Sequence, residues 1–207
     1  MKLLIIGPQG SGKGTQAEIL SEKLRIPHIS TGDIFRSLQG PLKKKVDEII
    51  NKGNLVPDEL TLEILKNRLE KEDCKKGFIL DGFPRNLNQA RLLKKITKID
   101  KVIEITLDDK TAIKRITGRR LCKKCKINYN IFTEPKPKNP EICDECGGKL
   151  VRRKDDTENA VKKRLEIYKK ETLPVLKEYD NILTINGNQS IKEMTEEIIN
   201  NLELKTD

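Results

Sequence analysis

A glycine-rich segment near the N-terminus constrains the fold of this chain more than any other feature. Residues 7–15 have the sequence GPQGSGKGT; they follow the apolar run 3–6 and precede a helix-periodic segment over 16–24. A loop that surrounds phosphate oxygens with its own N–H groups needs glycine, which lacks a Cβ and allows positive φ. The segment therefore predicts a strand, a phosphate-binding loop and a helix whose N-terminus adds further N–H donors.

Two side chains of this loop suit the binding of phosphate and magnesium. Lys13 would bring an ammonium group to the terminal phosphates, and Thr15 would offer a hydroxyl to magnesium. In the general pattern the hydroxyl residue directly follows the lysine, whereas here Gly14 stands between them. The alternative is a glycine-rich turn that merely joins a strand to a helix, but the G-x-x-x-x-G-K spacing lies in the strand-to-helix context that the motif requires.

Short apolar runs predict the strands of a parallel sheet. They lie at residues 2–6, 28–30, 78–80, 101–107 and 181–185. Helical periodicity between the runs gives the alternation typical of an α/β fold, here with three layers and a five-stranded parallel sheet flanked by helices. Ser190 and Glu193 predict a capping box at the last helix. A longer helix is predicted over 157–179, with a break near Pro174.

Two segments interrupt this alternation. Residues 31–57 hold short polar helical pieces, and residues 118–156 hold turns, prolines and four of the five cysteines. Ligands of open α/β proteins bind at the loop edge of the sheet, so insertions there predict two mobile arms. We expect the core to comprise residues 1–29, 57–117 and 157–207, one arm to comprise residues 30–56, and the second arm, a lid, to comprise residues 118–156.

The charge of the chain is concentrated in one region. The 207 residues carry a formal net charge of +10, and between Lys110 and Lys154 there are 14 Lys or Arg against 4 Asp or Glu. This region also holds Tyr129 and Phe132, which indicates a folded segment around polyphosphate or metal. Its basic charge is the only support for an alternative class, a zinc-ribbon nucleic-acid binder with ATPase activity. No signal peptide or membrane span is apparent, so we expect a cytoplasmic protein.

Four cysteines form two C-x-x-C pairs. Cys122 and Cys125 are separated by 17 residues from Cys143 and Cys146, which is the spacing of a structural zinc site with four thiolates. The alternatives are two disulfides or thiols that are merely near one another, and a cytoplasmic location disfavours the disulfides. The remaining Cys74 is expected to be an incidental buried thiol.

Several charged residues suit phosphoryl transfer, which needs positive charge around the moving group. Arg115 and Arg119 are four residues apart and would share one face at a helix end, whereas Arg153 and Arg164 flank two aspartates. In the alternative interpretation all four are solvated surface charges.

Carboxylates and amides form a second set of candidates. Asp81 follows a predicted strand and could hold magnesium or its waters, and Asp33 is a candidate for the same role. Asn86 and Gln89 could instead cap the next helix. The only histidine, His28, opens a predicted strand and is interpreted as structural.

Together, these motifs resemble those of the adenylate kinase family, in the family's order and over essentially the whole chain. The matching segments are GPQGSGKGT at 7–15, STGD at 30–33 with Arg36, LVPD at 55–58, DGFPR at 81–85 with Gln89, GRR at 118–120, and RKDD at 153–156 with Arg164. The Gly14-Thr15 ending is the family's own pattern. The resemblance implies a P-loop kinase fold, reversible conversion of ATP and AMP to two ADP with Mg²⁺, one structural Zn²⁺, a monomer, and no nucleic-acid or membrane partner.

The resemblance also implies roles for individual residues. The ATP site would comprise Gly10, Ser11, Gly12, Lys13, Gly14, Thr15, Arg115, Arg119, Asn128, Tyr129 and Gln189. The AMP site would comprise Thr31, Arg36, Asn54, Leu55, Val56, Gly82, Phe83, Pro84, Arg85, Gln89, Arg153 and Arg164. The catalytic residues would be Lys13, Arg119, Arg153, Arg164 and Asp81, and Asp81 with Asp33 would position magnesium through waters.

Two positions vary within the family or depart from its pattern. Some relatives with a zinc-bearing lid have Asp as the fourth ligand, where this chain has Cys146, and Asn128 stands where a hydroxyl residue often precedes the lid tyrosine. A kinase for UMP or CMP is the alternative within the same enzyme class. Gln89 favours adenine, because an amide can pair with an adenine edge through two hydrogen bonds.

Overall fold

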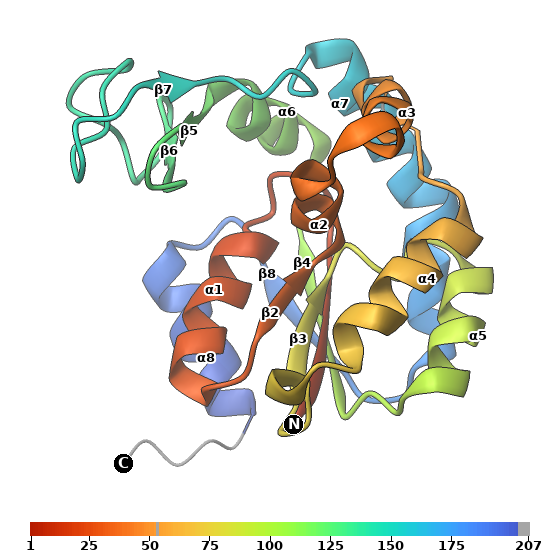
Figure 1. The fold of residues 1–207 in the computed structure, drawn as a ribbon. Coiled ribbons are helices and arrows are strands. Elements are labelled where there is room, and N and C mark those ends of the chain that lie inside the picture. Colours follow the sequence, from red (N-terminus) through yellow and green to blue (C-terminus); the bar gives the residue numbers. More distant parts are fainter. Residues whose placement is uncertain (53, 203–207) are drawn as a thin grey trace.

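The computed structural model describes residues 1–52 and 54–202. The predicted arm and core extend outside the described residues only at residue 53 and residues 203–207. A parallel five-stranded sheet lies at the centre of the molecule, in the order β2-β3-β1-β4-β8 (Figure 1). Its strands are β1 (Lys2–Ile6), β2 (His28–Ser30), β3 (Phe78–Asp81), β4 (Lys101–Thr106) and β8 (Ile182–Asn186). The predicted α/β fold class is confirmed.

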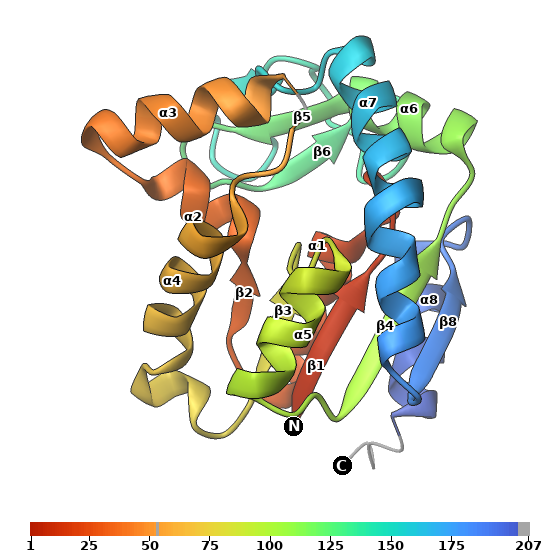
Figure 2. The ribbon, with the colours of Figure 1, turned by 90° about the vertical axis from the view of Figure 1, so that its right-hand side faces the viewer.

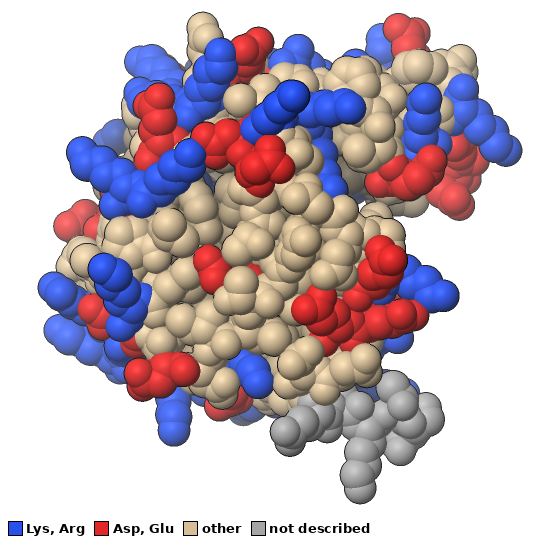
Figure 3. Space-filling model, turned by 180° about the vertical axis from the view of Figure 1, so that it is seen from behind, with Lys and Arg blue, Asp and Glu red and all other residues tan. Residues whose placement is uncertain are grey.

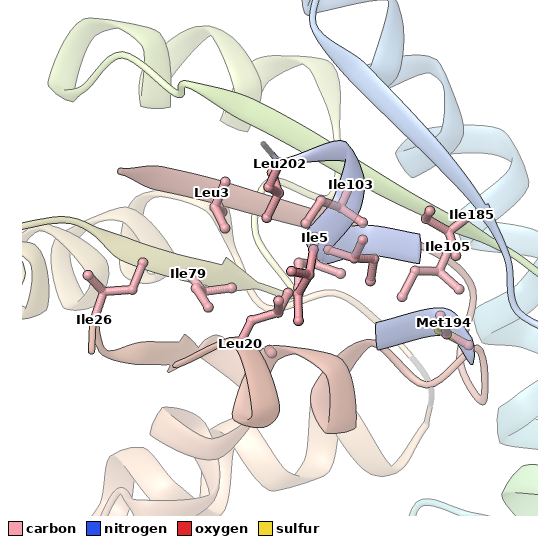
Figure 4. Close-up of a cluster of buried hydrophobic side chains, with 13 residues drawn as sticks. Leu3, Ile5, Leu20, Ile26, Ile79, Ile103, Ile105, Ile185, Met194 and Leu202 are labelled. Carbon is pink, nitrogen blue, oxygen red and sulfur yellow. The ribbon is translucent and has the colours of Figure 1, made fainter. Parts of the chain in front are cut away.

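Helices cover both faces of this sheet (Figure 2). Helices α1 (Lys13–Leu24) and α8 (Ile191–Asn201) lie on one face, and α4 (Asp58–Leu69) and α5 (Leu87–Ile96) lie on the other. Alternate residues of β1 point to opposite faces, as the two-residue period of a strand requires. Leu3 and Ile5 pack with α1 and α8 (Figure 4), whereas Leu4 and Ile6 pack with α4 and α5. The three-layer architecture follows from this alternation.

The long helix predicted over 157–179 is interrupted, as expected. Helix α7 (Glu158–Ile167) widens into a π-helical turn, η2 (Tyr168–Thr172), and then tightens into a 3₁₀ helix, η3 (Leu173–Glu178). Pro174 lies in the first turn of η3, where its missing N–H costs no helical hydrogen bond. The predicted capping box at Ser190 and Glu193 is confirmed at the start of α8.

The two inserted segments each have an apolar cluster of their own. Helices α2 (Thr31–Ser37) and α3 (Gly40–Asn51) form the first and enclose Phe35, Val46 and Val56. The second, the lid, is an antiparallel sheet of β5 (Arg119–Cys122), β6 (Asn128–Asn130) and β7 (Leu150–Val151), and it projects beside the core at the upper left of Figure 1. Apart from cysteines, the buried members of the lid cluster are Tyr129 and Leu150.

The end of α6 (Asp109–Gly118) falls between Arg115 and Arg119. Arg119 is the C-cap of this helix and begins β5, so both arginines lie at the helix end, as predicted. A Cβ at Gly118 would lie 2.5 Å from side-chain atoms of Asn130 and Phe132, so only glycine permits β6 and the segment after it to approach the helix end. The chain therefore turns from helix to strand between the two arginines. Other elements are the short 3₁₀ helix η1 (Glu72–Cys74) and the connecting turns.

Candidate active site

A cavity of about 740 Å³ lies at the carboxyl edge of the sheet, and residues of the phosphate loop and of both inserted segments line it. Nearly all the residues predicted to bind nucleotide or magnesium line it. The exceptions are Thr31, which is 3% exposed and donates to the Gly82 carbonyl at 2.9 Å, and Phe83, which is 1% exposed and packs in the core. The sequence-predicted residues that line the cavity are Gly10, Ser11, Gly12, Lys13, Gly14, Thr15, Asp33, Arg36, Asn54, Leu55, Val56, Asp81, Gly82, Pro84, Arg85, Gln89, Arg115, Arg119, Asn128, Tyr129, Arg153, Arg164 and Gln189.

The phosphate loop depends on glycine at specific positions. Gly10 and Gly12 have φ values of +83° and +97°, in the left-handed region that side chains rarely adopt, and Gly12 caps α1. Lys13 begins α1 and its Nζ donates to the Pro8 carbonyl at 2.9 Å, so its side chain folds back over the loop. Burial lowers the pKa of Lys13, and the facing Asp81 carboxylate only partly offsets this effect. The loop thus holds a cation over a concave set of backbone N–H groups.

The two candidate magnesium residues lie at the ends of two neighbouring strands, Asp81 in β3 and Asp33 in the helix that follows β2. Ser30 at the end of β2 pairs with Asp81 at the end of β3, and Asp33 follows in the first turn of α2. Burial raises the pKa of Asp81, but His28 and Lys13 hold it below its ordinary value. Burial also raises the pKa of Asp33, but Arg36, whose Nη2 lies 2.6 Å from its carboxylate, outweighs this effect and the pKa is lowered. Both groups are therefore ionised oxygen ligands at neutral pH, the type that Mg²⁺ prefers.

Arginines surround the space between these carboxylates and the lid. Arg119 makes two hydrogen bonds to the buried Asp156 at 2.9 and 2.5 Å, and Arg164 donates to Asp155 at 2.8 Å. These acidic neighbours fix the arginine side chains in place without occupying every donor of the guanidinium groups. The Nε of Arg153 has no hydrogen-bond partner among the described residues, and burial and the charge of Arg119 lower the pKa of Arg153 to about 10.

Buried polar atoms without a hydrogen-bond partner concentrate in this cavity. Among the described residues there are six such side-chain atoms, and five belong to residues that line it: Gln9 Oε1, Ser11 Oγ, His28 Nε2, Asn128 Oδ1 and Arg153 Nε. Buried polar groups in folded proteins are normally paired, so a cluster of unpaired ones marks a place where a polar ligand completes the structure. The cavity is therefore a candidate binding site for a polar molecule.

The predicted nucleotide-binding residues Arg115, Gln189 and Gln89 are held by different contacts. Arg115 donates to the carbonyls of Gly187 at 2.8 Å and Gly10 at 3.3 Å, so it clamps the phosphate loop to the segment after β8. Gln189 is tied to Glu197 at 2.6 Å. Gln89 accepts a hydrogen bond from the Arg85 N–H at 2.7 Å, while Asn86 supplies the cap of α5. The capping role considered for Asn86 and Gln89 is thus realised by Asn86.

Sequence reasoning left some residues of this region without a role. His28, interpreted as structural, lines the cavity with its Nε2 3.7 Å from Asp81. Asp155 and Asp156 hold two of the arginines. Asp58 accepts hydrogen bonds from three side-chain amides. The sequence contains little indication of these contacts, because each one depends on side chains that the fold brings together from separate elements.

The ion pair between Asp155 and Arg164 yields a prediction about stability. The pKa of Asp155 is held below its ordinary value: burial raises it, but Arg164 and Arg119 outweigh that effect. The ionised carboxylate therefore stabilises the fold above the unfolded pKa, and this contribution disappears as the pH falls through the folded pKa. Asp155→Asn should lower the free energy of unfolding by about 2 kcal/mol at pH 7, with a smaller difference below about pH 4.

Urea denaturation at several pH values would measure this difference. Asp180→Asn is the matched control, since that carboxylate is exposed and should give no difference at any pH. A loss in Asp155→Asn that stays constant down to pH 3 would contradict the ion-pair explanation.

The four cysteines of the lid come together as predicted. Their sulfurs all lie within 4.8 Å of one another, with Cys122 and Cys146 at 3.5 Å and Cys125 and Cys143 at 3.6 Å. Tetrahedral zinc with bonds of about 2.3 Å would separate its sulfurs by about 3.8 Å, so this arrangement fits the ion. A Cβ at Gly148 would lie 3.0 and 3.2 Å from the sulfurs of Cys122 and Cys146, so glycine leaves room for the thiolates.

The phosphate loop at the edge of a five-stranded parallel sheet, facing a ring of arginines, defines a P-loop nucleotide-binding protein of the kinase type. A family model described as adenylate kinase matches residues 5–183. The chain is 48% identical to an adenylate kinase of Caldicellulosiruptor saccharolyticus over 210 residues, covering 96% of this chain and 97% of that protein. It is 48% identical to an adenylate kinase of Clostridium tetani, covering 97% of each. The chain belongs to the adenylate kinase family.

Proposed function

We propose that this chain is an adenylate kinase, which transfers the terminal phosphoryl group of ATP to AMP and back, giving two ADP. The observation that carries the proposal is the cavity itself, in which unpaired buried polar atoms and arginines from the core and the lid face one phosphate loop. Hydrolysis would need only a donor site. A second set of polar residues, which includes Arg36, Arg85 and Gln89, lines the same cavity and supports a second nucleotide.

The donor site lies at the phosphate loop and the lid. Backbone N–H groups of residues 10–15 and the Lys13 ammonium would bind the phosphates of ATP, with Arg119 reaching them from β5. Arg115, Asn128, Tyr129 and Gln189 would form the nucleoside end. The unpaired Oδ1 of Asn128 could accept a hydrogen bond there.

The acceptor site lies between β3 and the α2–α3 arm. Arg36 and Arg85 would hold the phosphate of AMP, and Gln89 would meet its base. The backbone of residues 54–56, the turn 82–84 and the buried Thr31 would shape the walls. Arg153 and Arg164 lie where the phosphates of both nucleotides would meet.

Catalysis would rest on alignment and charge. The arginines and Lys13 neutralise the charge that develops on the transferred group, and no general base is required. Asp81 and Asp33 would hold Mg²⁺ through its waters, and the ion would supply further positive charge beside the ATP phosphates. Because Arg119 and Arg153 belong to the lid, closing it would both complete the site and exclude water.

The wider setting is also part of the proposal. The core of residues 1–29, 57–117 and 157–207 would carry two mobile arms, 30–56 and 118–156, in a monomeric cytoplasmic protein. Among the described residues, no helix has the length and apolar character to cross a bilayer. Figure 3 presents the opposite side of the molecule, where basic and acidic side chains are interspersed over the lid at the upper right. On this face of the molecule the side chains do not form the coherent basic surface that a nucleic-acid binder needs.

The choice of acceptor provides the direct test. We expect ADP to form rapidly from ATP and AMP with Mg²⁺, and only slowly from ATP alone. UMP and CMP should be poor acceptors, because a pyrimidine does not present the same edge to Gln89. A coupled assay with each acceptor measures this. Equal rates with and without AMP would indicate an ATPase, and a preference for UMP or CMP would reassign the acceptor.

A further inference from the structure

Asp58, at the start of α4, receives an unusual set of hydrogen bonds. Three side-chain amides at the start of α5 donate to its carboxylate: Asn86 at 3.0 Å, Asn88 at 2.9 Å and Gln89 at 2.6 Å. Gln89 is 2% exposed and lines the cavity, whereas Asp58 is not among the residues that line it. Asp58 thus contacts Gln89 from outside the cavity, whereas Gln89 itself lines the proposed acceptor site.

These contacts determine which way the Gln89 amide points. Burial raises the pKa of Asp58, but the hydrogen bonds from Asn88, Asn86 and Gln89 outweigh it and hold the pKa below its ordinary value. An ionised carboxylate can only accept, so the group of Gln89 that faces it is the NH₂. At the other end the Arg85 N–H can only donate, so it faces the Gln89 oxygen, at 2.7 Å. Rotating the amide by 180° would place the Gln89 oxygen against the Asp58 carboxylate and the Gln89 NH₂ against the Arg85 N–H.

The fixed amide retains one donor and one acceptor for a ligand. One N–H of Nε2 and one lone pair of Oε1 remain after the bonds to Asp58 and Arg85. Adenine offers the complementary pair, an N1 acceptor beside a 6-amino donor. Hypoxanthine has nearly the same shape but the reverse pattern, an N1–H donor beside a 6-oxo acceptor. A 6-oxopurine would therefore bind well only if the amide turned over.

We propose that Asp58 is a positioning residue that fixes the Gln89 amide and thereby makes the acceptor site select a 6-aminopurine monophosphate over a 6-oxopurine monophosphate. The inference rests on the proposed function, since it concerns the base of the AMP acceptor. Asp58 itself touches no substrate. Its effect reaches the base through one rotatable amide, and the Arg85 N–H acts in the same direction from the other end.

The test compares AMP with inosine monophosphate as acceptors in the wild-type chain and in Asp58→Asn. Asparagine has the same shape, but its own amide can turn to present NH₂ to a reversed Gln89. The ratio of kcat/KM for AMP to that for inosine monophosphate should fall about tenfold, a size typical of a hydrogen bond to a charged group. The change should appear mainly in KM, because the transferring phosphates are remote from the base. Some preference for AMP should remain, since the Arg85 N–H is unchanged.

Asn88→Ala is the matched control. It removes another donor to Asp58 but leaves the contact between Asp58 and Gln89 in place, so the ratio should stay at the wild-type value. If Asp58→Asn lowers both activities equally, or leaves the ratio unchanged, Asp58 has no role in selecting the base. Should Asp58→Asn fail to fold, Asp58→Ala serves as the second variant, with the same expected fall in the ratio.

Different results would contradict the proposed function and the proposed role of Asp58. A wild-type chain that does not phosphorylate AMP would overturn the proposed function. A wild-type chain that phosphorylates AMP, with folded Asp58 variants that keep its selectivity, would overturn only the role of Asp58.

Discussion

Replacing Lys13 by methionine is expected to lower kcat about 10²–10³-fold, the usual effect of removing one preorganised donor from a developing charge. Lys13 stands at the first position of α1 and its ammonium lies over the phosphate loop, 2.9 Å from the Pro8 carbonyl. No other lysine lies within residues 7–15. The nearby arginines come from other elements and would bind other phosphate oxygens, so they would not replace it.

The fold should tolerate this change. Methionine preserves most of the aliphatic stem, and the lost hydrogen bond to Pro8 is worth only about 1 kcal/mol. The burial that lowers the pKa of Lys13 also means that its charge is costly to the fold, so removing it offsets part of that loss. Steady-state kinetics and thermal melting measure the two effects separately. Lys23→Met, an exposed lysine in the last turn of the same helix, is the control that should alter neither. Near-normal turnover in Lys13→Met would refute the assignment of Lys13.

The parts of the molecule that the sequence predicts well are those determined by neighbouring residues. Apolar runs define the five strands to within one or two residues at each end, and the glycines of residues 7–15 define the loop. Prediction of the cysteine cluster also rests on local spacing, because each C-x-x-C pair brings two sulfurs into one turn. In each of these cases the physical constraint acts within a few positions of the chain.

The contacts that could not be predicted join residues distant in sequence. Asp58 meets Gln89 because α4 and α5 pack side by side on one face of the sheet. His28 approaches Asp81 because β2 and β3 pair with Ser30 opposite Asp81. The helix that carries Arg115 ends at Gly118, where the Asn130 side chain of β6 approaches closely. Hydrophobic periodicity carries no information about such pairings, which depend on register and packing.

Loss of the zinc site is expected to have the largest effect on stability. In Cys143→Ala the zinc content should fall from one ion per chain to well below one, and the melting temperature should fall by about 5–10 °C, given about 2–4 °C per kcal/mol for a chain of this size. Cys143 is 2% exposed and sits among the few buried side chains of the lid, where Tyr129 and Leu150 alone make a small apolar cluster. Such a cluster is too small to hold the lid without a metal.

Activity at moderate temperature should suffer less than stability, because the sulfurs lie in the lid and not among the residues that line the cavity. Cys74→Ala is the matched control: this thiol is equally buried but belongs to the core, beside Arg68, so its loss should leave the zinc content at one per chain. Elemental analysis and calorimetry of both variants, purified without chelator, measure the two quantities. Wild-type protein without zinc, or equal zinc loss in both variants, would show that the four thiols do not form the metal site.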